Sequence, residues 1–141
     1  MRSIVVGTDG SDTAAQALRE ACELAKTTGA KLHIVSAYVP LGGARVAGED
    51  RGTWMVGPDV QVDAVLDEAA GSVHTRGVEV ESYARKGDPA DALLSVADEQ
   101  DADLIVVGNK GMTGAKRFLL GSVPDKISHH ASCSVLIVRT S

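Results

Sequence analysis

Apolar residues along the chain form five short runs that alternate with longer amphipathic segments. The runs at residues 4–6 and 104–107 are continuous in Val, Ile and Leu, which is typical of strands covered on both faces. The other runs span residues 31–39, 78–84 and 135–138 and also predict strands. We expect the two uninterrupted runs to be the central strands of one sheet.

Four segments between the predicted strands carry apolar residues at helical spacing. The first ends near Gly29 and presents one buried face. That face comprises Ala14, Leu18, Ala21, Cys22 and Ala25. The second begins around Pro58, ends before Gly77 and has one apolar stripe. That stripe comprises Val62, Val65, Leu66, Ala69 and Val73.

The two later helices have clear start signals. Asp88 can cap the amides of the third helix, and Pro89 takes the first helical position, where a missing N–H costs nothing. The fourth helix follows Gly121, with Ser122 as its expected N-cap and Asp125 three residues further on. Strands and helices therefore alternate along the whole chain.

This alternation predicts an α/β fold, a single domain over residues 1–141 with an open parallel sheet, right-handed crossovers and helices on both faces. Ligands of such sheets bind beyond the carboxyl ends of the strands, where the strand order reverses. The loops after Val6, Val39 and Val107 are therefore the first places to look for a site. The loop after Val39 is the long glycine-rich segment 40–57, and irregular segments of this length are more often functional or disordered than inert.

The segment that follows the strand at 104–107 combines glycines with basic residues. Residues 108–121 contain three basic residues and no acidic one, in a chain whose net charge is −5. A strand that runs into such a loop and then a helix N-terminus predicts a phosphate site, because unpaired amides and the helix dipole favour an anion. The Ser122 hydroxyl adds a donor, whereas Pro124 removes one. Each glycine alone would serve equally as a turn residue, but the combination favours binding.

Composition excludes several classes of function. The net charge of −5 argues against a duplex nucleic-acid partner, and an aromatic content of 3% argues against stacking of single strands or a flavin. No apolar run approaches the roughly 20 residues that span a membrane. Cys22 and Cys133 lie far apart without metal-ligand spacing. We expect a cytoplasmic protein with free thiols and with neither nucleic acid nor membrane as its partner.

The sequence shows no catalytic constellation. The Walker A, GxGxxG and GxSxG patterns are absent. The four histidines are dispersed, and the hydroxyls of Ser11, Ser95 and Thr113 have no evident base partner. We therefore expect no catalytic residue, and any turnover should be slow.

The glycine loop and the N-terminal block resemble the universal stress protein family. The pattern G-x2-G-x9-G-S that begins at Gly108 is similar to the family's ATP-binding motif. Residues 5–11 resemble its first strand and loop, and residues 87–89 resemble the start of its third helix. The resemblance covers essentially the whole chain. It implies a five-stranded sheet in the order 3-2-1-4-5 and a homodimer, often formed through the last strand.

The resemblance also implies a place for each part of an adenine nucleotide. Asp9 would lie near the ribose and phosphates, the Ala37 backbone would meet the adenine edge, and Gly108 would lie beside the ribose. The phosphates would be held by Gly111, Gly121, Ser122 and the Val123 amide. Asp9 is also one of three candidate caps of the first helix. Its carboxylate suits a phosphate site chiefly when Mg²⁺ lies between the two charges.

The resemblance thus implies a dimeric stress-response sensor or binding module that takes ATP with Mg²⁺. Cyclic AMP is the alternative ligand, because a cyclic monophosphate needs fewer donors and is compatible with Pro124. Two other interpretations of the function remain: a slow ATP hydrolase or phosphotransfer protein, and a scaffold with a vestigial site. Since aromatic residues are few, we expect adenine to contact aliphatic side chains and backbone edges.

Overall fold

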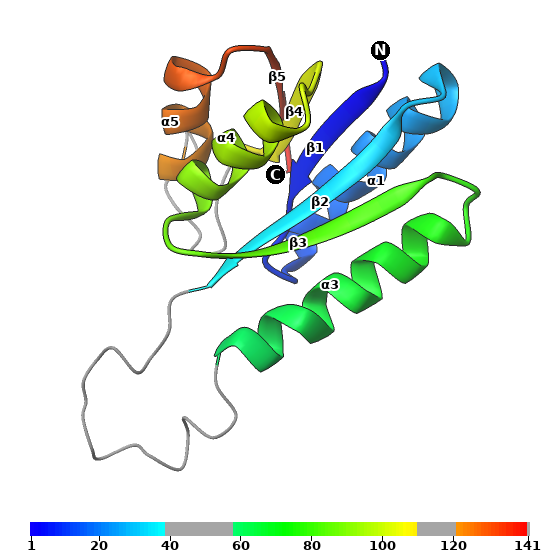
Figure 1. Cartoon of the computed structure of the whole chain (residues 1–141), viewed down its shortest axis with the longest axis horizontal. Coiled ribbons are helices and arrows are strands. Elements are labelled where there is room, and N and C mark those ends of the chain that lie inside the picture. The colour runs from blue at the N-terminus through cyan, green and yellow to red at the C-terminus, as the bar shows by residue number, and fades with distance from the viewer. Residues whose placement is uncertain (39–57, 110–120, 141) are drawn as a thin grey trace.

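The computed structural model describes residues 1–38, 58–109 and 121–140, which form one parallel sheet between two pairs of helices (Figure 1). The strands are β1 (Ser3–Gly7), β2 (Lys31–Tyr38), β3 (Val80–Lys86), β4 (Leu104–Gly108) and β5 (Ser134–Val138). The helices are α1 (Asp12–Thr28), α3 (Pro58–His74), α4 (Pro89–Glu99) and α5 (Ser122–His130). The last residue of the strand predicted over 31–39 and the whole segment 40–57 lie outside the described residues.

The strands lie in the order β3-β2-β1-β4-β5 and every neighbouring pair is parallel, which confirms the expected topology. β1 and β4 pair with each other near the centre of the sheet, as their uninterrupted apolar runs predict. Val5 and Val6 of β1 and Ile105 and Val106 of β4 are all fully buried. Strands covered on both faces leave no position for a polar side chain, which explains the continuous runs.

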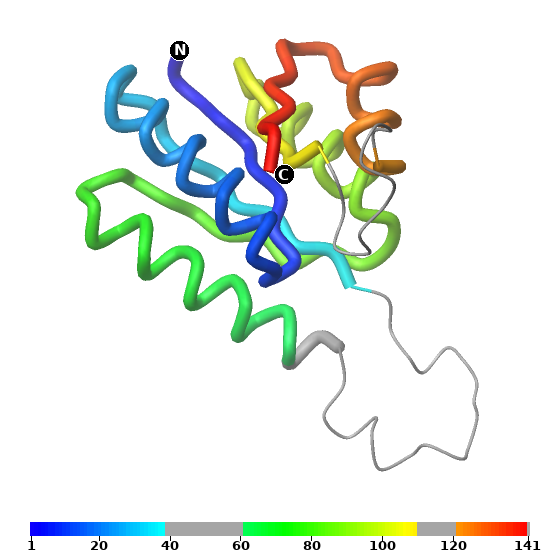
Figure 2. The backbone as a smooth tube through the Cα atoms, turned by 180° about the vertical axis from the view of Figure 1, so that it is seen from behind, coloured from blue at the N-terminus to red at the C-terminus, as the bar shows by residue number. Residues whose placement is uncertain are grey.

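Each face of the sheet is covered by two helices. Helices α4 and α5 lie on the face toward the viewer in Figure 1, and α1 and α3 are seen in front of the sheet from behind in Figure 2. The side chains form one core on each face. Cys22 lies in the core under α1 and is 1% exposed, which confirms its predicted place there.

The ends of α1 and α4 follow from local sequence signals. Ser11 caps α1, because its Oγ accepts the N–H of Ala14 at 3.2 Å, and Gly29 ends that helix with a φ of +76°. Asp88 caps α4 by accepting the N–H of Asp91 at 3.0 Å. The Asp88 start and the glycine end were predicted from the sequence, whereas Ser11 was one of three candidate caps that the sequence left open.

The third strand begins and ends two residues later than predicted. It spans Val80–Lys86 instead of 78–84, because its length is set by pairing with β2, which runs to Tyr38. The N–H of Gly87 still donates to the carbonyl of Tyr38 at 2.8 Å. The apolar residues Val78, Val80 and Tyr83 set the predicted bounds, whereas the ladder continues through the polar end of the strand.

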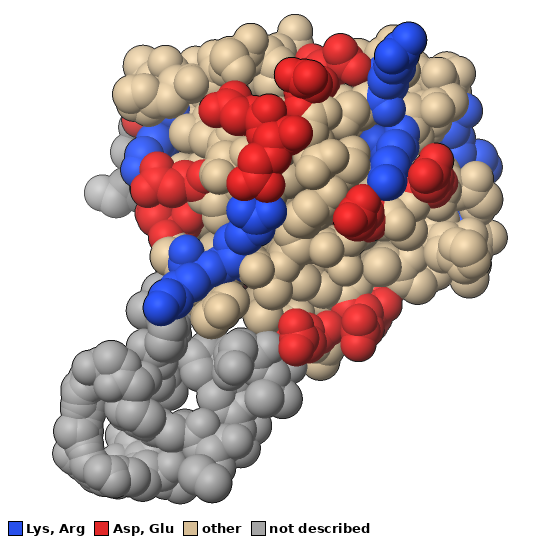
Figure 3. Space-filling view, in the orientation of Figure 1, with Lys and Arg blue, Asp and Glu red and all other residues tan. Residues whose placement is uncertain are grey.

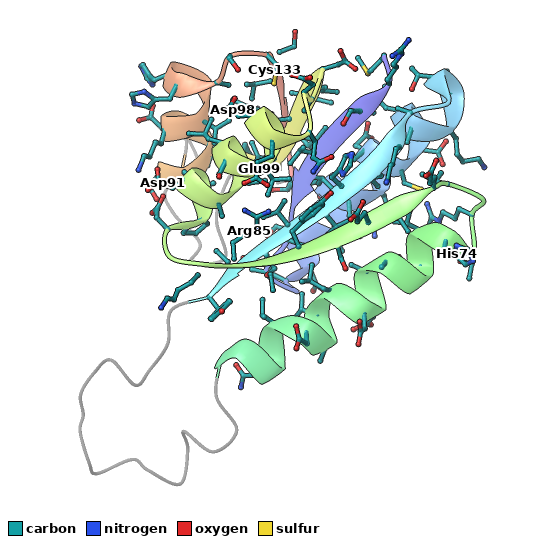
Figure 4. The ribbon with its side chains drawn as sticks, in the orientation of Figure 1. His74, Arg85, Asp91, Asp98, Glu99 and Cys133 are labelled. Atoms are coloured by element: carbon teal, nitrogen blue, oxygen red, sulfur yellow. The ribbon has the colours of Figure 1, made fainter. Side chains whose placement is uncertain are left out.

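An ion pair joins α4 to the edge strand β3. The guanidinium of Arg85 donates to both carboxylate oxygens of Glu99, at 2.9 and 2.8 Å, and Figure 4 shows the two side chains pointing toward each other. Hydrogen bonding by Arg85 lowers the pKa of the Glu99 carboxyl, so the pair is ionised at neutral pH. This bidentate contact fixes α4 across β2 and β3.

The described part of the surface carries mixed charge. On the face shown in Figure 3, acidic and basic side chains lie interspersed and form no continuous basic surface. Among the described helices, none combines the length and the apolar character that crossing a membrane requires.

We predict that the Asp88 cap stabilises the fold in a pH-dependent way. Its pKa lies below the ordinary 3.8, first because the backbone N–H of Asp91 donates to it and then because Lys126 is nearby. A lowered pKa in the folded state means that the charge stabilises the protein above pH 3.8 and that this contribution is lost as the pH falls through the lowered value. Asp88→Ala should lower the free energy of unfolding by about 1 kcal/mol at neutral pH in urea titrations.

Asp88→Asn separates charge from capping, because asparagine is an equally good N-cap. Its deficit should be smaller than that of the alanine variant at neutral pH and should vanish in acid below pH 3.8. A deficit that is the same at both pH values would contradict an electrostatic contribution.

Candidate functional site

The order of the strands reverses between β1 and β4. The crossover from β1 leads to β2 on one side, and the crossover from β4 leads to β5 on the other. Ile4 pairs with Leu104 and Val6 with Val106, so the two strands end side by side. The loops that leave them lead to opposite sides of the sheet, and ligands of such sheets bind at the carboxyl edge between these loops, here called the crevice.

Gly7 ends β1 and allows α4 to approach this edge closely. A Cβ at this position would lie 3.0 Å from Cδ1 of Leu93, a fully packed residue of α4. Gly108, which ends β4, is half-buried at the same edge. The structure therefore places Gly108 at the carboxyl end of β4, and its place beside a ribose stays a prediction.

The loop from β1 to α1 is held by short side-chain contacts. The N–H of Ser11 donates to Oδ1 of Asp9 at 2.8 Å, and the N–H of Gly10 donates to Oγ1 of Thr8 at 3.2 Å. Asp9 is therefore not the helix cap, a role that Ser11 fills. Its carboxylate is exposed at the mouth of the crevice and folds back on its own loop.

β2 extends beyond the end of β1, and this leaves part of its edge without a strand partner. The last contact between the two is the N–H of Thr8 donating to the carbonyl of Val35 at 2.9 Å. In a strand the N–H and C=O of one residue point to the same side, and alternate residues share that side. The N–H and C=O of Ala37 therefore point to the side of β2 where β1 has ended. This is where the resemblance places the edge of an adenine.

The start of α5 differs from the prediction. Gly121, and not Ser122, is the N-cap, with extended backbone angles and no side-chain cap. The N–H of Asp125 donates to the carbonyl of Gly121 at 3.1 Å, so the first helical turn closes on the glycine and Ser122 becomes the first helical residue. The Ser122 hydroxyl is thus not used as a cap. Ser122 is exposed at the helix start.

The donors at the start of α5 can be counted one by one. The N–H of Gly121 donates to the carbonyl of Asn109 at 3.0 Å, Pro124 has no N–H, and the N–H of Asp125 is used within the turn. The N–H groups of Ser122 and Val123 have no acceptor among the described residues. Two amides and one hydroxyl therefore stand at the positive end of the helix dipole. This set suits a single phosphate group.

Asn109 is a part of this site that the sequence argument did not single out. Its N–H donates to the carbonyl of Val138 at 2.8 Å, and its Oδ1 accepts both the N–H and the hydroxyl of Thr140, at 2.9 and 2.8 Å. Together with the Gly121 contact, one residue joins the ends of β4 and β5 to the start of α5. The available signal was its place directly after a central strand, where site residues gather.

Part of the predicted site falls outside the described residues. Gly111 and the three basic residues of the loop, Lys110, Lys116 and Arg117, fall outside the described residues. Within residues 1–38, 58–109 and 121–140, no group of three His, Cys, Asp or Glu side chains comes together as a metal site. His74 lies at the far end of α3 in Figure 4. Any Mg²⁺ here would rely on phosphate and water oxygens with Asp9 as one carboxylate, which is a common way to hold this ion.

The start of α5 is also tied to the start of α4. Nζ of Lys126 lies 2.9 Å from Oδ1 of Asp91 and 3.5 Å from Oδ2 of Asp88. The hydrogen bond to Asp91, followed by the charge of Asp88, raises the pKa of Lys126. This cation is therefore satisfied by α4, and the two helix starts are held together along the crevice.

Comparison with known proteins gives relatives over the full length of the chain. The model of the universal stress protein family matches residues 1–139. The universal stress protein Rv1636 of Mycobacterium tuberculosis is 41% identical over 144 residues, which cover 99% of this chain and 97% of the relative. The universal stress protein YxiE of Bacillus subtilis is 35% identical over 148 residues, which cover 96% and 97%.

Solved structures give the same match. A universal stress protein in complex with cAMP has a TM-score of 0.76 and 37% identity, and the match covers 99% of this chain and 98% of that one. The universal stress protein of Archaeoglobus fulgidus in complex with dAMP has a TM-score of 0.71 and 29% identity, with 97% of both chains covered.

The surroundings of two glycines, Gly10 in the first loop and Gly71 in α3, predict opposite effects of substitution by alanine. Gly10 has a φ of +84°, and a Cβ there would lie 3.1 Å from Cγ2 of Val65 on α3. Gly10→Ala should therefore lower the free energy of unfolding by about 1–2 kcal/mol in urea titrations. Gly71, within α3, has open space around its Cβ position, so Gly71→Ala should raise that free energy by up to about 1 kcal/mol.

A second change separates contact from backbone strain. In a Val65→Ala background the loss caused by Gly10→Ala should be smaller, because the methyl group that it meets is gone. Equal stability of Gly10→Ala and the unmodified protein would contradict the loop geometry.

Proposed function

Because the chain belongs to the universal stress protein family, we propose that it binds an adenine nucleotide in the crevice between β1 and β4. The observation that carries the proposal is the pair of Ser122 and Val123 amides at the start of α5, which have no acceptor among residues 1–38, 58–109 and 121–140. Two similar proteins solved in complex with cAMP and with dAMP support the ligand class. In the cell the chain would act as a nucleotide-binding module of the stress response.

We propose that the phosphate end of the site prefers a nucleoside monophosphate, with cyclic AMP first. Two amides and a hydroxyl can satisfy one phosphate group, and Pro124 and the Asn109 contact remove two donors that a longer phosphate chain could use. The Asp9 carboxylate would repel further phosphates unless a cation lay between them. Its exposed position keeps ATP with Mg²⁺ as the second candidate.

The adenine end of the site would be read by the backbone. The N–H and C=O of Ala37 offer one donor and one acceptor, which is the pattern that the edge of adenine can match. The side chain of Ala37 packs on the core below α4, so the strand edge is held rigidly. This arrangement selects a base by hydrogen bonds and needs no aromatic ring.

The family resemblance and the free edge of β5 together support a homodimer. Residues Val135, Leu136, Ile137 and Val138 are all only half-buried, although each is aliphatic. Among the strands that the structure describes, β5 pairs only with β4, so its outer backbone groups would be available to a second copy. β3, at the other edge, carries charged residues that protect it from such pairing. We propose a cytoplasmic dimer, and the free thiols of Cys22 and Cys133 fit a reducing compartment.

Calorimetry with cyclic AMP and with ATP in the presence of Mg²⁺ tests the ligand directly. Cyclic AMP should bind, and Ser122→Ala should weaken it by about three- to tenfold, because one hydrogen bond to the phosphate is lost. Ser128→Ala is the matched control, since this serine lies on the same helix away from its start and bonds only the Asp125 carbonyl. It should bind like the unmodified protein.

Failure of both nucleotides to bind below millimolar concentration would overturn the proposal. Tighter binding of ATP with Mg²⁺, lost in Asp9→Ala, would favour the second candidate. Release of phosphate from ATP at enzyme-like rates, also lost in Asp9→Ala, would favour a hydrolase.

Sedimentation equilibrium tests the dimer. The chain should have twice its 14.6 kDa mass, and Ile137→Lys should shift it toward 14.6 kDa, because a lysine on an edge strand opposes pairing. Ser82→Lys on the opposite edge strand is the control and should leave the mass unchanged. A shift caused equally by both substitutions, or a monomeric unmodified chain, would contradict assembly through β5.

A further inference from the structure

Asn109 connects three segments that are far apart in the sequence. Its backbone N–H extends the β4–β5 pairing to Val138, and its carbonyl accepts the N–H of Gly121. Its side chain turns toward Thr140, which follows β5 and is 9% exposed. The backbone of Asn109 thus supports the helix start, and its side chain is anchored to the end of the chain described.

The start of α5 has no side-chain cap, although Lys126 in its first turns is paired with α4. Its N-cap is a glycine without a side-chain cap, so the carbonyl of Asn109 is the described group that holds the N–H of Gly121. The direction of that carbonyl depends on the orientation of the Asn109 peptide groups. Two hydrogen bonds from the buried Thr140 to one oxygen fix the side chain of Asn109. Loss of this anchor would release rotation at the base of the helix.

We propose that Asn109 is a positioning residue for the phosphate group and that Thr140 is its anchor. The proposal rests on the proposed function, because the groups that Asn109 aims are the amides of Ser122 and Val123. It also assigns Gly121 a role different from that implied by the family resemblance. The N–H of Gly121 is used to orient the helix and does not itself bind phosphate.

The contacts of Asn109 could also serve only to extend the β4–β5 ladder and stabilise the fold. This structural role and the positioning role predict different results when Asn109 is replaced. If Asn109 only stabilises the fold, its substitution should raise amide exchange throughout the sheet. If it is a positioning residue, its substitution should raise exchange at the start of α5 while the core strands keep their protection. In this second case nucleotide affinity should fall by more than any loss of folded protein explains.

The test uses the full chain and two measurements: amide hydrogen exchange by NMR without ligand, and calorimetry with cyclic AMP. Asn109→Ala removes the acceptor, Thr140→Val removes the hydroxyl with little change of shape, and Thr140→Ser keeps the hydroxyl. Thr28→Val is the matched control, because its hydroxyl donates to the carbonyl of Leu24 at 2.7 Å, within α1 and away from the site.

Asn109→Ala should speed exchange of the Gly121 amide by about tenfold. It should weaken the binding of cyclic AMP by a similar factor, as expected for the loss of two hydrogen bonds. Thr140→Val should have about a threefold effect on both, and Thr140→Ser and Thr28→Val should stay within about twofold. Exchange of the Val106 amide in the core should not change in any of the four.

Unchanged exchange at Gly121 in Asn109→Ala, or equal acceleration at Gly121 and Val106, would overturn the positioning role. If the unmodified chain does not bind cyclic AMP, the proposed function fails. The exchange measurement, made without ligand, then still decides whether Asn109 and Thr140 position the start of α5.

Discussion

The pairing of β1 with β4 is the constraint on which the rest of the structure depends. The two strands supply fully buried residues to both cores, so their side chains hold the helices on either face. Their crossovers lead to opposite sides of the sheet, so the two loops diverge at its carboxyl edge. The crevice is therefore a consequence of topology and does not depend on any single side chain.

Polar backbone groups that the fold leaves without partners gather around this crevice. β1 ends at Gly7 while β2 continues to Tyr38, so the Ala37 N–H and C=O have no strand partner among the described residues. The first turn of α5 likewise leaves the amides of Ser122 and Val123 without acceptors among the described residues. An adenine nucleotide carries complementary groups at both ends. Under the proposed function the nucleotide would be bound chiefly through these backbone atoms, which suits a chain with few aromatic residues.

The sequence predicted those features that depend on local chemistry. Asp88 caps its helix as expected, and Ser11 is the one of three candidate caps that fills this role in α1, because each places an oxygen next to unpaired amides. The bounds of β3 were not predictable from its own residues, since pairing with β2 carries the strand into a polar stretch. Ser122 was assigned as a cap from residue type, whereas the long-range contact between Asn109 and Gly121 shifts the cap to the glycine. The strand order followed from the family resemblance, and periodicity alone does not contain it.

The central claim is that the Ser122 and Val123 amides bind the phosphate. The most direct measurement is an NMR titration of the ¹⁵N-labelled chain with cyclic AMP. The account predicts that the amide protons of Ser122 and Val123 move downfield on binding, as new hydrogen bonds form, while the Gly121 amide, held by Asn109, moves little. A titration that saturates with its large shifts away from the start of α5, or that shows no binding, would contradict it.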